Sequence, residues 1–131
     1  EILSANPEAY GHVKFYIPEN ETNIVMNLSG RRVGFAHGHI TGKSGTPQQK
    51  IKNWWQDQAF CDTNIGSSQL LITGHYHHFS VIEYDNDKIH IQCPSMDGGS
   101  EWWVDLTGQN SRPGTLTMVI SSRGYQDLEI I

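Results

Sequence analysis

The sequence predicts an α+β fold class, mostly β with one clear helix. Short apolar runs bounded by Gly, Asn, Asp and Ser recur along the chain and indicate strands. One segment carries its apolar residues at helical spacing instead. The chain has 131 residues, 37% hydrophobic and 18% charged, which suits one hydrophobic core rather than two. We therefore expect residues 1–131 to form a single domain.

The first elements are two strands. The polar run 4–8 is expected to be loop-like. Residues 24–28 and 33–36 are apolar, and the Ser-Gly-Arg-Arg sequence at 29–32 is typical of a tight connection between strands. The second strand runs directly into His37-Gly38-His39.

The helix is predicted over residues 47–60. Thr46 is placed to be the N-cap, Pro47 fits the first turn, and Gln49 fits the capping box. Four apolar residues then recur at helical spacing: Ile51, Trp54, Trp55 and Ala59. We expect the two tryptophans to face the core.

The remaining elements are strands. Residues 69–73 form an apolar strand that ends at Gly-His-Tyr-His-His, and residues 79–84 and 88–92 are expected to form a hairpin through Asp-Asn-Asp. Residues 93–114 are rich in Pro, Gly, Ser and Asn, which predicts an ordered loop anchored by Trp102 and Trp103. A closing hairpin of residues 116–120 and 127–131 completes the fold.

Charge and cysteine content exclude some classes of protein. The net charge of -5 argues against a broad basic surface for nucleic acid, although two bound dications would add about four positive charges locally. Cys61 and Cys93 form no CxxC motif, so a reduced, cytoplasmic setting is expected. No run approaches the roughly 18 apolar residues needed to cross a bilayer, so no membrane partner is expected. Glu1, in place of Met, suggests that something was removed upstream.

Five of the histidines lie in loops at predicted strand ends, where catalytic and binding residues are often found. Two predicted strands run into loops that carry His37 and His39, and His75, His77 and His78. In near-extended backbone His75 and His77 would point to the same side, about 6 to 7 Å apart at Cα, so they could ligate adjacent metals or one shared metal. Gly74 leaves room for the backbone to approach an ion. The alternative is that these are loop histidines bonded to backbone carbonyls.

These motifs resemble a known family. Residues 35–39 and 74–77 resemble the last two metal-binding motifs of calcineurin-like metallophosphoesterases, H-G-H at a strand end and G-H-x-H. Residues 89–95 resemble the following strand and N-P-G-S-type turn, although Cys93 stands where Asn is usual. Residues 42–55 and 95–114 look most like phage-encoded members described as phosphoesterases or DNA exonucleases. The resemblance implies the carboxyl-terminal half of the family's αββα sandwich, within a larger metallophosphoesterase.

The resemblance also implies roles. His37 and His75 would be ligands of one metal and His77 of the other. His39 and His78 would be catalytic candidates that support the ligands or contact substrate phosphate, with ordinary loop hydrogen bonding as their alternative. The complete protein would hold two divalent transition metals, Mn, Fe, Zn or Ni, because imidazole suits these better than Ca or Mg. His12 and His90 fit no motif and are expected to be structural or solvent-facing.

One half of the family's pattern is missing. The D-x-H, G-D and G-N-H motifs, which supply the bridging carboxylate, do not occur in this sequence. Three neutral imidazoles cannot hold two dications roughly 3.5 to 4 Å apart, because nothing offsets the repulsion between the ions. The expected partner is therefore a missing amino-terminal half of the same protein. The isolated chain is expected to be inactive or weak, and the complete protein to hydrolyse phosphodiesters, with DNA as a candidate substrate.

Two other functions stay open. The Trp54-Trp55 and Trp102-Trp103 pairs are compatible with a non-catalytic binding or assembly module, since an exposed Trp can stack on a base or sugar. The same three histidines, His37, His75 and His77, are also compatible with a mononuclear zinc site.

Overall fold

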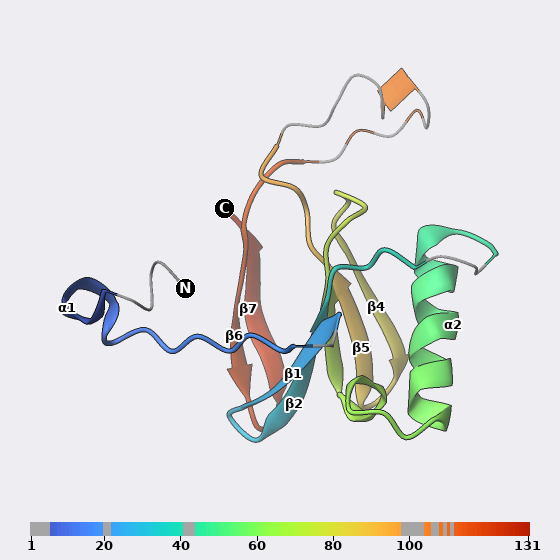
Figure 1. Ribbon diagram of the computed structural model, residues 1–131. Helices are drawn as coiled ribbons and strands as arrows, with labels where there is room; N and C mark the ends of the chain where they lie inside the picture. Colours follow the sequence, from blue (N-terminus) through green and yellow to red (C-terminus); the bar gives the residue numbers. More distant parts are fainter. Residues whose placement is uncertain are drawn as a thin grey trace.

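The protein is built of three layers (Figure 1). The computed structural model describes residues 6–19, 22–40, 44–97, 104–105, 108, 110 and 112–131. A five-stranded sheet lies in the middle, helix α2 (Pro47–Phe60) covers one face, and a hairpin of β6 (Leu116–Ser121) and β7 (Gly124–Ile130) covers the other. The α+β class, mostly strand with one long helix, is thus confirmed.

The sheet mixes parallel and antiparallel pairs. Its strands are β1 (Asn23–Leu28), β2 (Arg31–Ala36), β3 (Leu70–Thr73), β4 (Ser80–Asp85) and β5 (Lys88–Gln92), in the spatial order β1-β2-β3-β5-β4. The pairs β1–β2 and β4–β5 are antiparallel hairpins, whereas β3 runs parallel to both β2 and β5. The carboxyl ends of β2, β3 and β5 therefore lie at one edge of the sheet.

Helix α2 begins and ends where the sequence predicts. The Thr46 hydroxyl accepts a hydrogen bond from the Gln49 backbone N–H at 3.3 Å, and Pro47 occupies the first turn. Ile51 and Trp55 are buried against the sheet with Leu71 of β3. The Trp55 indole N–H donates to the carbonyl of Ile65, in the short 3-10 helix η1 (Ile65–Ser67), at 2.9 Å. Trp54 packs partly buried against the same cluster, so the expectation that this pair faces the core is confirmed.

A second core cluster joins the sheet to the β6–β7 hairpin. Val33, Leu70 and Ile91 are its buried members. Partly buried side chains of the hairpin pack onto them: Leu116, Met118, Ile120, Tyr125 and Leu128. Alternate residues of β6 face this core, as expected for a strand with one solvated face.

Strand β7 differs from the prediction of a strand at 127–131. It begins at Gly124 because Ser122 and Arg123 suffice for the turn, and Ser121 pairs directly with Gly124. Asp127 has φ +51° at an irregularity where the register shifts, so Tyr125 and Leu128 both face the core although three positions apart. Because this irregularity interrupts the alternation of side chains along the strand, its first half was not predicted from the sequence.

The amino-terminal end departs from the predicted loop as well. Pro7–Tyr10 form the one-turn helix α1, capped by the Asn6 side chain, which accepts from the Ala9 N–H at 3.3 Å. Ten of the 22 residues of the predicted loop over residues 93–114, among them Trp102 and Trp103, lie outside the described residues. Within the described part of the chain, no helix is long and apolar enough to cross a membrane.

Candidate metal centre

The two histidine loops meet because β2 and β3 are parallel neighbours. Their last residues, Ala36 and Thr73, are register partners, so the loops leave the sheet side by side. The Gly74 N–H donates to the His37 carbonyl at 3.2 Å, which joins the loops directly. Ile40 and Tyr76 anchor one loop each by packing against the core under α2. The histidines beside these anchors are thus presented at the carboxyl edge of the sheet.

Three imidazole rings converge there. His75 lies between His37 and His39, and both ring pairs have centroids 4.8 Å apart in edge-on geometry. The Nδ1 atom of His75 is 3.0 Å from Nε2 of His37, and its Nε2 atom is 3.2 Å from Nδ1 of His39. Both nitrogens of the central ring therefore face a neighbouring imidazole nitrogen. The prediction that separate strand ends bring His37 and His75 together is correct in this geometry.

The backbone that carries these rings is not extended. His75 has φ +72° and His77 has φ +54°, both in the left-handed region that side-chain-bearing residues rarely adopt. The predicted alternation of an extended strand, which placed His75 and His77 on one side, is therefore wrong. A turn sets the directions of these two rings, and the first loop turns too, at Gly38 with φ +95°.

Electrostatics keep the central ring in the form that binds metals. The pKa of His75 is lowered, first by desolvation and then by the nearby imidazoles of His37, His39 and His77. A lowered pKa favours neutral imidazole at neutral pH, which is the form that ligates a metal.

His78, His90 and His12 stand apart from the three converging rings. The His78 carbonyl accepts a hydrogen bond from the Gln92 side chain at 2.5 Å, and the buried Nδ1 atom of His78 has no hydrogen-bond partner in the described part of the chain. His90 is fully buried, its Nε2 atom lies 2.8 Å from the Thr73 hydroxyl, and its ring stacks on Tyr84. His12 is exposed. The structural or solvent-facing roles expected for His90 and His12 agree with these positions.

The donor chemistry of the three rings suits a transition metal, but the set is incomplete. Imidazole nitrogens are good ligands for Zn, Fe, Ni and Cu. In the described parts of the chain, however, no group of three or more His, Cys, Asp and Glu side chains is arranged to hold a metal ion. A site for two dications would therefore need carboxylates from elsewhere.

A cavity opens beside His37. It has a volume of about 390 Å³ and is lined mainly by apolar side chains of β1, β2 and β3, among them Ile24, Phe35 and Ile72. Cys93 also lines it, and burial raises the pKa of its thiol, so the thiol stays protonated at neutral pH. The cavity is thus also lined by His37, which the sequence predicts to be a metal ligand.

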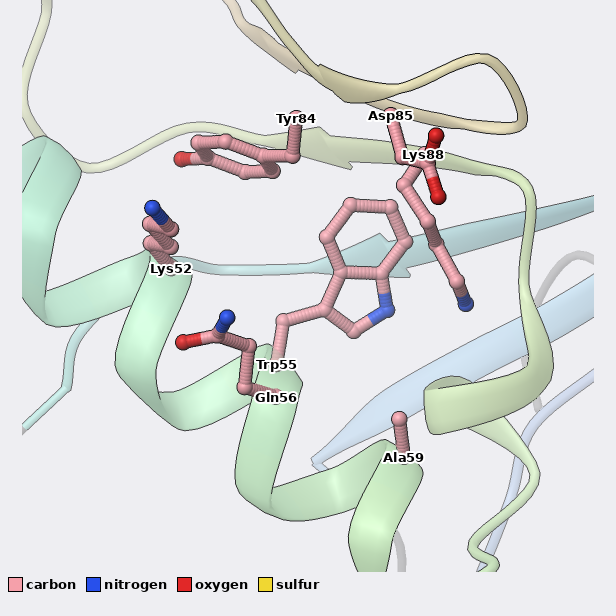
Figure 2. A pocket seen from close by; sticks show the side chains of 7 residues that line it. All are labelled: Lys52, Trp55, Gln56, Ala59, Tyr84, Asp85 and Lys88. Carbon is pink, nitrogen blue, oxygen red and sulfur yellow. The ribbon is translucent and has the colours of Figure 1, made fainter.

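A second cavity, of about 250 Å³, lies between α2 and β4 (Figure 2). Trp55 and Tyr84 line it, and Lys52 and Lys88 lie near these rings, 5.5 Å from the Tyr84 centroid and 4.8 Å from the Trp55 centroid respectively. The Lys88 ammonium donates to the carbonyls of Gly66 and Ser68 at 2.6 and 2.7 Å. None of the strand-end histidines lines this cavity, so it is separate from the candidate centre.

Sequence reasoning missed Gln92 and the link between Thr73 and His90. Thr73 and Gln92 lie at the ends of β3 and β5, beneath the second loop, and His90 lies in the middle of β5. A polar residue at the end of an apolar strand was the available signal. Taken alone, it does not reveal which loop the side chain contacts.

Comparisons with known proteins support the fold. No protein-family model matches the chain, and no curated protein does. Among solved structures, it is similar to Entamoeba histolytica Vps29 complexed with Zn²⁺, with 22% identity over 86% of this chain and 57% of that one, at a TM-score of 0.57. It is also similar to a single-mutant form of the same Vps29, with 19% identity, 89% and 64% coverage and a TM-score of 0.57.

These likenesses establish a metallophosphoesterase-like α+β fold. The chain spans 57% and 64% of these two structures, which is less than two thirds of each.

Proposed function

We propose that this chain is the carboxyl-terminal part of a dinuclear-metal phosphoesterase that hydrolyses phosphodiesters, with DNA as a candidate substrate. One observation carries the proposal: two parallel strand ends bring His37 and His75 to a nitrogen separation of 3.0 Å, in a chain with a metallophosphoesterase-like fold. Rigid strand ends that present converging imidazoles favour a metal site over scattered structural histidines.

The proposed roles follow from the positions of the rings. His37 and His75 would hold one divalent transition metal and His77 would contribute to a second. Carboxylates for both would come from a segment of the protein that precedes Glu1. The lowered pKa of His75 favours its neutral form, which is the form that binds a metal ion.

Bound metals would supply Lewis-acid polarisation of the phosphoryl oxygens and activation of the attacking water. The chain's own contribution is to orient the site. His39 is exposed, and its Nδ1 atom lies 3.2 Å from Nε2 of His75. Its other ring nitrogen, Nε2, can therefore donate a hydrogen bond to a phosphate oxygen. The apolar cavity beside His37 offers space for the non-reacting part of a substrate.

A second candidate is a mononuclear zinc site without hydrolytic activity. It is favoured by the similarity to a Vps29 structure that contains Zn²⁺. The alternative of a non-catalytic binding module is weakened, because Trp55 is only 3% exposed and so is not available to stack on a base or sugar.

Metal stoichiometry and phosphodiesterase activity together test the proposal. The chain joined to the region encoded upstream of Glu1 should bind about two metals per molecule and cleave bis(p-nitrophenyl) phosphate. His75→Ala should lose both properties, whereas His12→Ala, at an exposed site outside the cluster, should keep them. One metal per molecule without cleavage would support the zinc site instead. Cleavage unchanged in His75→Ala would refute both candidates.

A further inference from the structure

The second histidine loop crosses over the end of a strand. It connects β3, which ends at Thr73, to β4, which begins at Ser80, but β5 lies between these strands in the sheet. Gln92 is the last residue of β5 and is the register partner of both Thr73 and Ser80. It therefore lies directly beneath the loop, between its two ends.

The Gln92 side chain reaches that loop. Its amide nitrogen donates to the His78 carbonyl at 2.5 Å, and the residue is 0% exposed. A carbonyl oxygen can only accept, so the contact requires an N–H donor from the side chain. Gln92 thus joins the end of β5 to His78, the residue that follows His77 in the loop.

The loop needs such a tie because its backbone is strained. His75 and His77 both have positive φ, a conformation that persists in non-glycine residues when the surrounding structure holds it. Besides the contacts of the His75 ring with His37 and His39, the hydrogen bonds that the described structure shows for the loop are few. Gly74 N–H donates to His37, Tyr76 N–H donates to Gly74, and Gln92 supplies the contact on the β4 side. Loss of that contact would free the loop to relax toward ordinary φ values.

We propose that Gln92 is a positioning residue that fixes the directions of the His75 and His77 rings through the His78 carbonyl. The proposal builds on the assignment of these rings as metal ligands, but its geometry stands without metal. Among the described residues, two neighbouring buried atoms, His78 Nδ1 and Ser80 Oγ, have no hydrogen-bond partner, and neither does the Gln92 amide oxygen. The amide nitrogen is therefore the part of Gln92 that acts on the loop.

Gln92→Met removes the donor and keeps a side chain of similar volume without charge. Gln92→Leu is a second variant without a donor, which serves if Gln92→Met does not fold. The matched control is Ile91→Val, on the same strand but facing the opposite core cluster. The full chain is labelled with ¹⁵N-histidine, and the ring signals are recorded without metal. Titration with Zn²⁺ alone follows.

In the folded variants at position 92, the ring signals of His75 and His77 should shift or broaden, and Zn²⁺ affinity should fall by at least roughly tenfold, as for other residues that orient metal ligands. Ile91→Val should leave the ring signals in place. Unchanged His75 and His77 signals in Gln92→Met would overturn the proposal, even if its melting temperature fell. If the wild type binds no Zn²⁺ while the ring signals still respond to Gln92, the metal assignment fails and the positioning role holds.

Discussion

The Nε2 atom of His37 and the Nδ1 atom of His75 lie 3.0 Å apart, although 38 residues separate them in the chain. Two nitrogens that bind one tetrahedral zinc ion at about 2.0 to 2.1 Å are about 3.3 Å apart. The two rings are thus within a few tenths of an ångström of the spacing for a shared ion. The pairing of β2 with β3 supplies this spacing before any metal is bound.

A shared ion makes the effects of His37 and His75 non-additive. His37→Ala and His75→Ala should each weaken Zn²⁺ binding at least roughly tenfold, and the double variant should bind little worse than either. Calorimetric titration of the four proteins of this cycle measures the coupling. Losses that simply add would show that the two rings act on different ions. His12→Ala, at an exposed site, serves as the control.

The burial of His90 makes folding sensitive to acid. Desolvation lowers its pKa from 6.5 to about 4, so the folded state disfavours the charged ring. The resulting stability is present above pH 6.5 and is lost as the pH falls toward 4, because the unfolded chain binds the proton more readily. A shift of this size corresponds to on the order of 3 kcal/mol. Urea unfolding at pH 7.5 and 4 should show a smaller pH-dependent loss in His90→Gln, while His12→Gln should match the wild type.

The core under α2 should tolerate little loss of volume. Ile51 is fully buried against Trp55 and Leu71, so Ile51→Ala removes several methyl and methylene groups from a packed site. We expect a decrease of about 2 to 5 kcal/mol in the free energy of unfolding, measured in urea. Ile17→Ala, at a side chain that is 74% exposed, should change it by less than about 0.5 kcal/mol. Equal effects of the two substitutions would contradict this packing.

Two glycines of the described structure should respond differently to a methyl group. A Cβ at Gly34 would lie 2.4 Å from Ile65 Cδ1 and 2.8 Å from the Ser68 hydroxyl, so Gly34→Ala should destabilise the fold by about 1 to 3 kcal/mol. At Gly74 the nearest atom would be the His37 carbonyl oxygen, at 3.8 Å. Gly74→Ala should therefore keep its melting temperature close to that of the wild type. A larger loss at Gly74 than at Gly34 would show that the second loop is packed more tightly than the structure indicates.

Local signals in the sequence predicted the elements well. The cap at Thr46, the proline in the first turn and the apolar spacing all act within the helix, so residues 47–60 were predicted with the observed bounds. The apolar runs likewise placed His37 and Gly74 at strand ends, where the structure has them. The prediction for strand β7 began too late, because the irregularity at Asp127 interrupts the alternation of apolar and polar residues on which that prediction depended.

Features that depend on long-range pairing were beyond the reach of these signals. The left-handed backbone of His75 and His77 follows from how the loop crosses β5, and His residues carry no mark of positive φ in a sequence. The tie from Gln92 has the same origin, since it depends on a parallel register between β3 and β5. The roles of the histidines as ligands and in catalysis stay predictions that the proposed experiments address.

The parallel register of β2 and β3 also has a consequence for folding kinetics. The hairpins β1–β2 and β4–β5 join neighbours in the chain, whereas Val33 can pair with Leu70 only after the whole of α2 has been looped out. Closing so large a loop is slow compared with forming a hairpin, so we expect the imidazoles to meet late in folding. A ligand that bridges them should then slow unfolding while leaving the refolding rate nearly constant.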